Sequence, residues 1–323
     1  MKTMYNPRKV VIVGAGAVGS TFAYALAQKS LADEIALIDV NREYAEGQVL
    51  DLAHGLPYYP SVDIYVGENE DFADAHVIVI TAGAKQAPGE SRLDLLQKNS
   101  RIIEGLIDEI VSQKSQAIVL IASNPVDVLT HVALQRSGWP KNRVIGSGTV
   151  LDSARFRYLL SQHCNVDVGN VHAYILGEHG DSEFAAWSMT HVGGVPIDEY
   201  CPMCDGCDDW GVSREGIVKT VRESAYHIIN YKGATYFAIG MALTRIVGTI
   251  LQDQRSVLTV STLLEGEYGI EDVCLGIPCV VGKDGVHQVI EANLTPEEQG
   301  SLQKSAATLK SALKELYDTI TTD

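Results

Sequence analysis

Residues 10–19 of the chain read VVIVGAGAVG, and this stretch decides the fold. Its first four residues are β-branched and apolar, the pattern of a strand buried on both faces of a parallel sheet. They run directly into G-x-G-x-x-G, and a helical stretch over residues 20–29 follows. Strand, glycine motif and helix in this order predict a dinucleotide-binding unit. The glycines permit a tight turn and let a pyrophosphate approach the helix N-terminus.

A carboxylate completes this unit. A second predicted strand over residues 34–38 ends at Asp39, twenty residues after Gly19. A carboxylate there would accept hydrogen bonds from a ribose diol and would repel a 2′-phosphate. The unit therefore predicts NAD, rather than NADP, as the cofactor.

Strands and helices continue to alternate along the first half. Residues 76–81 (HVIVIT) and 117–122 (AIVLIA) are apolar strands, separated by a helix over residues 93–112. The glycine-rich stretch 83–91 (GAKQAPGES) is typical of a mobile loop. The alternation predicts an α/β fold with a Rossmann doubly wound parallel sheet. It ends near residue 146, so we expect an NAD-binding domain over residues 1–146 and an α+β catalytic domain over residues 147–323.

Composition excludes several classes of function. Of the 323 residues, 46% are hydrophobic and 20% charged, as in ordinary globular proteins, and the formal charge is -16. So much negative charge argues against binding nucleic acid or an anionic membrane through bulk electrostatics. No stretch approaches the roughly 20 apolar residues of a membrane span, and residues 1–9 lack a signal core. We therefore expect a cytoplasmic protein, with which six reduced cysteines are compatible.

A histidine loop supplies the candidate chemistry. His179 lies in GEHGDS (residues 177–182), after an apolar run over 171–176 that predicts a strand. Histidine exchanges protons near neutral pH, so His179 is a candidate acid/base, with a surface turn as the alternative. Asp152 could orient its imidazole or serve as a helix N-cap. Arg155 could hold an anion or lie solvated on a helix.

Six motifs, in order along essentially the whole chain, resemble those of the lactate/malate dehydrogenase family. They are VGAGAVGS (13–20), TAGAKQAPGESRLDL (81–95), SNPVD (123–127), GSGTVLDSARFR (146–157), GEHGDSE (177–183) and KGATYFAIG (232–240).

The resemblance implies a role for each matching residue. His179 matches the proton donor and acceptor, and Asp152 its carboxylate partner. Arg155 matches the bidentate clamp on the substrate carboxylate, and Arg92 the residue that polarises the carbonyl when the loop closes. The other implied substrate residues are Gln86, Asn124 and Thr235. The implied cofactor residues are Gly14, Gly16, Ala17, Val18, Gly19, Asp39, Gly83, Ala84, Ser123, Asn124 and Ser147.

Substrate choice depends on Gln86. The equivalent position in the family tends to be glutamine for a substrate ending in a methyl group and arginine for a second carboxylate. Neutral Gln86 could not compensate the extra charge of oxaloacetate in a poorly solvated pocket. We therefore expect pyruvate and L-lactate as the substrates. Lys85 could meet a second carboxylate if it pointed inward, which leaves malate or another 2-hydroxy acid as the alternative. The intact catalytic set argues against a non-catalytic NAD-binding module.

Two further residues match an effector site. Arg157 and His172 correspond to positions that bind fructose 1,6-bisphosphate between subunits in allosteric bacterial members of the family, which are tetramers. Cationic groups suit this ligand because two phosphates must be neutralised. The alternative is that Arg157 pairs with a carboxylate and His172 is an ordinary strand residue.

Three cysteines depart from the family pattern. Cys201, Cys204 and Cys207 form C-x-x-C-x-x-C, which could supply three thiolates to zinc or an iron–sulfur cluster. His191 and Asp208 are poor fourth ligands by spacing, so we expect surface thiols and no metal. The remaining cysteines (Cys164, Cys274 and Cys279) are predicted in the core. The tail, residues 297–317, predicts an amphipathic helix.

Overall fold

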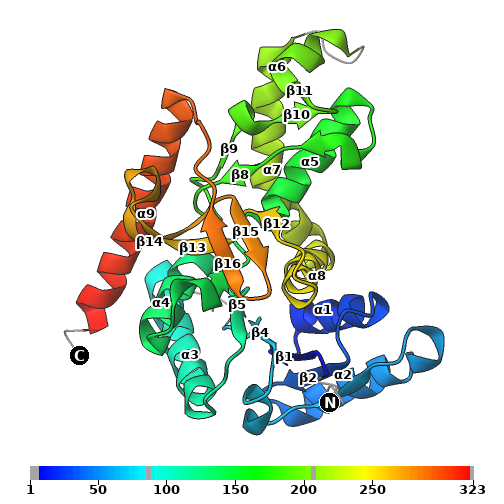
Figure 1. Cartoon of the computed structure of the whole chain (residues 1–323). Helices are drawn as coiled ribbons and strands as arrows, with labels where there is room; N and C mark the ends of the chain where they lie inside the picture. The colour runs from blue at the N-terminus through cyan, green and yellow to red at the C-terminus, as the bar shows by residue number, and fades with distance from the viewer. Residues whose placement is uncertain (1–6, 85–88, 90, 205–208, 321–323) are drawn as a thin grey trace, which may run out of the picture.

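The structure is a computed structural model that describes residues 7–84, 89, 91–204 and 209–320 (Figure 1). Within these residues the largest sheet has eight strands in the order β14-β13-β6-β5-β4-β1-β2-β3. Six of them are parallel, and β13 and β14 join antiparallel. The strands are β1 (Lys9–Val13), β2 (Glu34–Ile38), β3 (Asp63–Val66), β4 (Val77–Ile80), β5 (Ile118–Ile121), β6 (Val144–Gly146), β13 (Ser261–Glu265) and β14 (Glu271–Gly276).

The apolar runs of the sequence form the centre of this sheet. All residues of β1, β4 and β5 are buried. In the register of β1, Val11 lies opposite Ala36 on β2 and Ile78 on β4. Side chains on both faces are covered, which is why these strands are continuously apolar rather than alternating. The predicted doubly wound α/β fold is confirmed.

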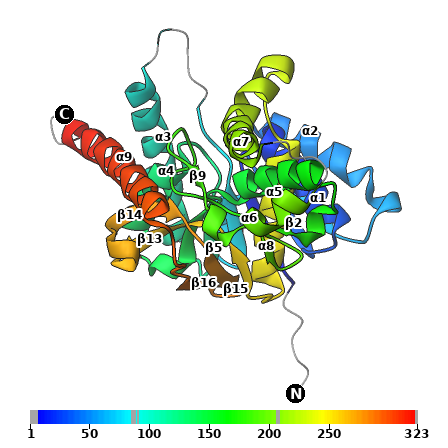
Figure 2. The ribbon, with the colours of Figure 1, turned by 90° about the horizontal axis from the view of Figure 1, so that it is seen from above.

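The helices of the first half cover both faces of the sheet. They are α1 (Ala17–Gln28), α2 (Arg42–Ala53), α3 (Arg92–Ser112) and α4 (Val126–Ser137). From β1 the chain adds strands in one direction (β2, then β3), and from β4 it adds them in the opposite direction (β5, then β6). Because each crossover is right-handed, α1 and α2 lie on one face of the sheet and α3 and α4 on the other. Figure 2 shows the two pairs on opposite sides. A crevice therefore opens at the carboxyl ends of β1 and β4, the usual ligand position in such sheets.

The second half adds three small sheets and further helices. The strands are β7 (Val171–His172), β10 (His191–Val192) and β11 (Val195–Pro196); β8 (Ile175–Leu176) and β9 (Phe184–Ala185); and β12 (Ser256–Leu258), β15 (Cys279–Gly282) and β16 (Gly285–Val289). The helices are α5 (Val150–Cys164), α6 (Ile197–Tyr200), α7 (Trp210–Lys232), α8 (Phe237–Leu251) and α9 (Pro296–Ile320). Among the residues that the structure describes, no helix combines the length and apolarity needed to cross a bilayer.

The tail helix packs on its own chain. Helix α9 contacts α3, α4 and β14, and Figure 2 shows it alongside α3 and α4. The leucines at helical spacing are all buried: Leu302, Leu309, Leu313 and Leu316. The predicted amphipathic helix is confirmed, and its apolar face lies against the core.

The predicted single strand over residues 171–176 is wrong. The run divides into β7 and β8, which belong to different sheets. The Ile175 N–H donates to Ser153 Oγ at 2.9 Å, and the Tyr174 carbonyl accepts from the Ala186 N–H at 2.9 Å. These partners draw the chain away from β10, the neighbour of β7. An apolar run cannot reveal such a change of partner.

The boundary between residues 146 and 147 stays a prediction. One sheet runs across it, because Ser261 on β13 pairs with Gly146 on β6. The second half therefore contributes two strands to the sheet of the first.

Two glycine substitutions test how tightly the first turn is packed. A Cβ on Gly19 would lie 1.9 Å from the Gly14 carbonyl oxygen, whereas a Cβ on exposed Gly105 of α3 meets nothing within 4 Å. We expect Gly19→Ala to lower the free energy of unfolding by about 1–3 kcal/mol or more. Gly105→Ala should raise it by about 0.5–1 kcal/mol through helix propensity. Urea unfolding of the wild type and the two variants measures both changes in the free energy of unfolding. Equal stability of Gly19→Ala and Gly105→Ala would contradict the close packing of Gly19.

Candidate active site

A cavity of about 410 Å³ gathers the predicted catalytic residues. His179 follows β8, Asp152 and Arg155 lie on α5, and Arg92 is the first residue of α3. Residues that line the cavity include Arg92, Leu95, Asn124, Asp152, Arg155, His179, Glu183, Val221, Arg222, Ala225, Tyr226 and Ile229. Side chains from α3, α5, α7 and the β8 loop thus meet at one place, as the sequence predicted for the histidine and its partners.

His179 and Asp152 form a close ion pair. His179 Nδ1 and Asp152 Oδ2 are 2.6 Å apart, and Arg155 Nη1 donates to Asp152 Oδ1 at 2.7 Å. Asp152 is 2% exposed, so both of its oxygens are satisfied by these cationic partners rather than by water. The helix N-cap alternative for Asp152 is excluded, because this residue lies inside α5.

This contact controls the charge of the imidazole. Burial would lower the pKa of His179, but the Asp152 charge and hydrogen bond outweigh burial and raise it to about 9. Burial would likewise raise the pKa of Asp152, and the charges of His179 and Arg155 lower it instead. At neutral pH the imidazole is therefore protonated and Asp152 is ionised. Because Nδ1 faces Asp152, Nε2 is the atom left to exchange a proton with a ligand.

A second buried carboxylate positions the histidine backbone. The His179 N–H donates to Asp127 Oδ2 at 2.8 Å, and Ser261 Oγ donates to Asp127 Oδ1 at 2.5 Å. Burial raises the pKa of Asp127 to about 6, against the opposing effect of these two hydrogen bonds. Sequence reasoning missed Asp127 as a site residue, although the SNPVD motif contains it.

Glu183 is a third buried carboxyl group and a second omission. Burial and the nearby Asp152 charge raise the pKa of Glu183 to about 8. Glu183 is therefore mainly uncharged at neutral pH, which avoids a second negative charge beside Asp152. Its backbone carbonyl accepts from Arg222 Nη2 at 2.8 Å, which attaches α7 to the cavity wall. Its position in the GEHGDSE motif was the available signal.

Arg92 stands at the point where α3 begins. Ser91 and Asp94 form a capping box in which the Asp94 N–H donates to Ser91 Oγ and the Ser91 N–H donates to Asp94 Oδ2, both at 3.1 Å. This cap holds the first turn of the helix and with it Arg92, whose side chain is exposed and lines the cavity. Gln86 and Lys85, on which the predicted substrate choice depends, lie outside the described residues.

The first glycine turn has the shape of an anion cradle. Gly14 has φ +103°, and a Cβ there would lie 2.7 Å from the Ala82 nitrogen. A Cβ on Gly16 would meet nothing within 4 Å, so this side of the turn is open. Gly16 is the N-cap residue of α1, and no side-chain cap hydrogen bond is formed there among the described residues. The backbone N–H groups of Ala17 and Val18, in the first turn of the helix, are therefore available to a ligand. A diphosphate fits this position.

Asp39 lies beside the cradle, where the ribose diol is predicted. Its Oδ2 accepts from the Ala15 N–H at 2.8 Å, and its Oδ1 accepts from the Asn41 N–H at 2.9 Å. Each carboxylate oxygen keeps a further lone pair for a hydroxyl group. The residues that would hold a dinucleotide therefore fit it at both the diphosphate and the ribose.

The other predicted cofactor residues follow neighbouring strands. Gly83 and Ala84 come after β4, Ser123 and Asn124 after β5, and Ser147 after β6. A buried residue that the sequence did not reveal, Asn99, connects two of these loops. Its Oδ1 accepts from the Ala84 N–H at 2.7 Å and its Nδ2 donates to the Asn124 carbonyl at 3.1 Å.

Two groups of predicted residues lie elsewhere. Thr235 follows α7 and is not part of the cavity lining. Arg157 and His172 line a separate groove of about 1080 Å³. Arg157 Nε donates to the Val171 carbonyl at 2.8 Å, and no carboxylate pairs with Arg157 in the part of the chain that the structure describes.

The cysteines differ in part from expectation. Cys164, Cys274 and Cys279 are buried, which confirms their predicted place in the core. Cys201 is also completely buried and Cys204 partly so, and the expectation of surface thiols is therefore wrong for Cys201. Cys207 lies outside the described residues.

Comparison with known proteins shows the family of the chain. The family model described as lactate/malate dehydrogenase, NAD binding domain, matches residues 8–146. The model described as lactate/malate dehydrogenase, alpha/beta C-terminal domain, matches residues 149–320.

Relatives and solved structures match over nearly the full length. An L-lactate dehydrogenase of Treponema denticola is 57% identical over 96% of this chain and 98% of its own, and one of Priestia megaterium is 50% identical over 96% and 98%. The crystal structure of a lactate dehydrogenase from a Medee basin deep-sea metagenome library has a TM-score of 0.94 at 44% identity, covering 97% of this chain and 100% of that one. The ligand-bound minor L-lactate dehydrogenase of Enterococcus mundtii has a TM-score of 0.93 at 44% identity, covering 96% and 98%.

The ion pair predicts the titration of His179. In Asp152→Asn the attraction is lost while burial remains, so we expect the pKa of His179 to fall from about 9 by about 1–3 units. Titration by NMR of histidine-labelled protein measures this change, and His179→Gln identifies the resonance. The resonance of His227, which is exposed and outside the cavity lining, serves as an internal reference. An unchanged His179 titration would show that Asp152 does not set its charge.

Proposed function

Because the chain belongs to the lactate/malate dehydrogenase family, we propose that it is an NAD-dependent L-lactate dehydrogenase, which interconverts pyruvate and L-lactate. The observation that carries the proposal is the His179–Asp152 pair, in one cavity with Arg92 and Arg155 and on the same sheet edge as the dinucleotide cradle. The names of the full-length relatives agree with this activity.

Each residue has a step in this reaction. NAD, when bound in its reduced form, supplies the hydride that reaches the carbonyl carbon of pyruvate. His179 Nε2 gives its proton to the carbonyl oxygen and takes it back when L-lactate is oxidised. Asp152 keeps the other nitrogen protonated and favours the imidazolium form.

The two arginines bind and polarise the substrate. Arg155 holds the carboxylate of pyruvate with its planar fork while one N–H stays on Asp152. Arg92, which lines the same cavity from the start of α3, stabilises the negative charge that develops on the carbonyl oxygen. Apolar side chains of α7, among them Val221 and Ile229, line the same cavity, and a methyl group suits them better than a second carboxylate does.

Substrate preference tests the proposal. The wild type should reduce pyruvate far better than oxaloacetate in steady-state assays with NADH. Gln86→Arg supplies a counter-charge for the second carboxylate, and a buried charge partner is worth about 3–5 kcal/mol. The ratio of kcat/KM for the two substrates should then shift toward oxaloacetate by about a hundredfold or more.

Two control variants complete this experiment. Lys85→Ala should leave the preference unchanged, because the proposal assigns substrate choice to Gln86 and not to Lys85. His179→Asn should lose turnover and still bind NADH, because the cradle lies on other elements. A wild type that prefers oxaloacetate would contradict the proposed function, and an unchanged Gln86→Arg preference would contradict the role proposed for Gln86.

The quaternary state and location belong to the same proposal. Large apolar side chains are exposed along α1, α5 and α8, among them Tyr24, Tyr158, Phe237 and Met241. Exposed apolar surface of this kind supports an assembly, and we include the homotetramer of the family. The cytoplasmic location expected from the sequence is likewise part of the proposal.

Fructose 1,6-bisphosphate is the proposed effector. Arg157 is held over β7 by the Val171 carbonyl, next to His172, which is exposed. Arg245 lines the same groove, so three basic side chains surround a space large enough for a sugar bisphosphate. A guanidinium without a carboxylate partner among the described residues can bind a phosphate without breaking an ion pair.

The effector site predicts a change in pyruvate saturation. Fructose 1,6-bisphosphate at millimolar concentration should raise the apparent pyruvate affinity of the wild type by about 5–150-fold, the usual range of coupling. Arg157→Gln should lose this response and keep its maximal turnover. Arg136→Gln removes a surface arginine paired with Asp108 and should respond like the wild type. Overlapping wild-type curves with and without effector, at acidic and neutral pH, would reject the site.

A further inference from the structure

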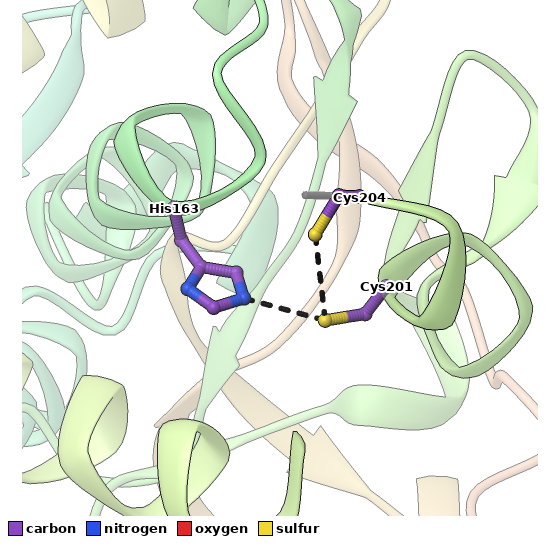
Figure 3. A group of neighbouring side chains, drawn as sticks. All are labelled: His163, Cys201 and Cys204. Atoms are coloured by element: carbon purple, nitrogen blue, oxygen red, sulfur yellow. Dashed lines mark hydrogen bonds between the residues drawn. The ribbon is translucent and has the colours of Figure 1, made fainter. Parts of the chain in front are cut away.

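A histidine and two cysteines meet outside the active-site cavity (Figure 3). His163 lies in the last turn of α5, Cys201 begins the 3₁₀ turn Cys201–Met203, and Cys204 follows this turn. His163 Nε2 is 3.3 Å from Cys201 Sγ, and the two sulfur atoms are 3.8 Å apart. One nitrogen and two sulfur atoms therefore point toward a common centre.

Local structure explains why the thiols converge. The Cys204 N–H donates to the Cys201 carbonyl at 3.0 Å, which closes a turn and places both side chains on the same side. Cys-x-x-Cys turns of this kind provide two ligands of many zinc sites. The third ligand comes from α5, far away in sequence, which is why spacing alone did not reveal His163.

The distances agree with a metal centre. Zinc binds thiolate sulfur at about 2.3 Å and imidazole nitrogen at about 2.0–2.1 Å with tetrahedral angles. Two bound sulfurs are then about 3.8 Å apart, and a bound sulfur and nitrogen about 3.6 Å. The S–S separation is 3.8 Å and the separation of His163 Nε2 from Cys201 Sγ is 3.3 Å, both close to these values. All three ligand atoms lie within 4.8 Å of one another, so His163 Nε2 and Cys204 Sγ would move closer by no more than about 1.2 Å on binding. A disulfide would require the sulfurs to approach to about 2.05 Å.

We propose that His163, Cys201 and Cys204 bind a zinc ion. Two thiolates and a neutral imidazole balance the charge of Zn²⁺, so the metal compensates the cost of an ionised thiol at the buried Cys201. Among the described residues, no fourth His, Cys, Asp or Glu joins this group. The proposal assigns the fourth position to a water molecule, because Cys204 is partly exposed.

The role of this zinc is structural. The His163 ring lies 5.7 Å from the ring of Trp210, the first residue of α7, and Trp210 Nε1 donates to Asp198 at 2.7 Å. The metal therefore fastens the Cys201 turn to α5 beside the start of α7, the helix that carries Arg222 and Tyr226 into the cavity. The zinc proposal depends only on the positions of these side chains in the fold, and it is independent of the proposed dehydrogenase reaction.

Metal binding to the full chain tests the site. The protein is treated with a chelator under reducing conditions, and Zn²⁺ is titrated against a chromophoric competitor. We expect one tight site per chain, a change in tryptophan fluorescence, and an increase in Tm with added zinc. Co²⁺ in the same site should show a thiolate-to-metal charge-transfer band and the intense visible bands of tetrahedral coordination.

Variants separate this site from adventitious binding. Cys201→Ser, Cys204→Ser and His163→Gln should each weaken zinc binding by at least about 100-fold, because a direct ligand is lost. Cys279→Ser and His227→Ala remove a thiol and an imidazole elsewhere and should bind like the wild type. Because Cys201 is buried, circular dichroism is needed to show that Cys201→Ser still folds. Cys204 is more exposed, so Cys204→Ser removes a zinc ligand with less effect on folding.

Several results would overturn the proposal. These are the absence of a stoichiometric site in the wild type, equal zinc affinity in the three ligand variants, and a Co²⁺ spectrum without thiolate bands.

Discussion

The contact between Asp152 and His179 is the interaction on which the rest of the site depends. A carboxylate that is 2% exposed is costly unless both oxygens have cationic partners, and here His179 and Arg155 provide them. The same contact fixes the imidazole tautomer and raises the pKa of His179 to about 9. One buried charge thus sets the protonation of the acid and anchors the arginine proposed to hold the substrate.

Burial also decides which acidic groups carry charge. Glu183 and Asp127 lie close to this pair, and burial raises the pKa of Glu183 to about 8 and that of Asp127 to about 6. Asp152 alone has two cationic partners, and its pKa is lowered. The three carboxyl groups therefore have different roles. Asp152 is the ionised partner of the imidazole, Asp127 accepts a hydrogen bond from the His179 backbone, and Glu183 is a mainly neutral residue of the cavity lining.

The continuous sheet connects the two halves of the molecule at this place. Ser261 on β13 pairs with Gly146 on β6, and its hydroxyl donates to Asp127, which in turn accepts from the His179 N–H. The histidine loop is thus attached to the same sheet whose other strands carry the dinucleotide cradle. This chain of hydrogen bonds fixes the position of His179, the proposed proton donor, relative to the sheet edge where the cofactor is proposed to bind.

The sequence by itself determined the features that depend on local pattern. Buried strands and the G-x-G-x-x-G turn follow from residue order, and the motifs identified His179, Asp152 and Arg92. Tertiary structure decided what depends on distant partners. It divided the run 171–176 between two sheets, placed Asp127 beneath the histidine loop, and brought His163 to Cys201 across 38 positions. Burial and long-range contact are properties of packing, and no short stretch of sequence contains them.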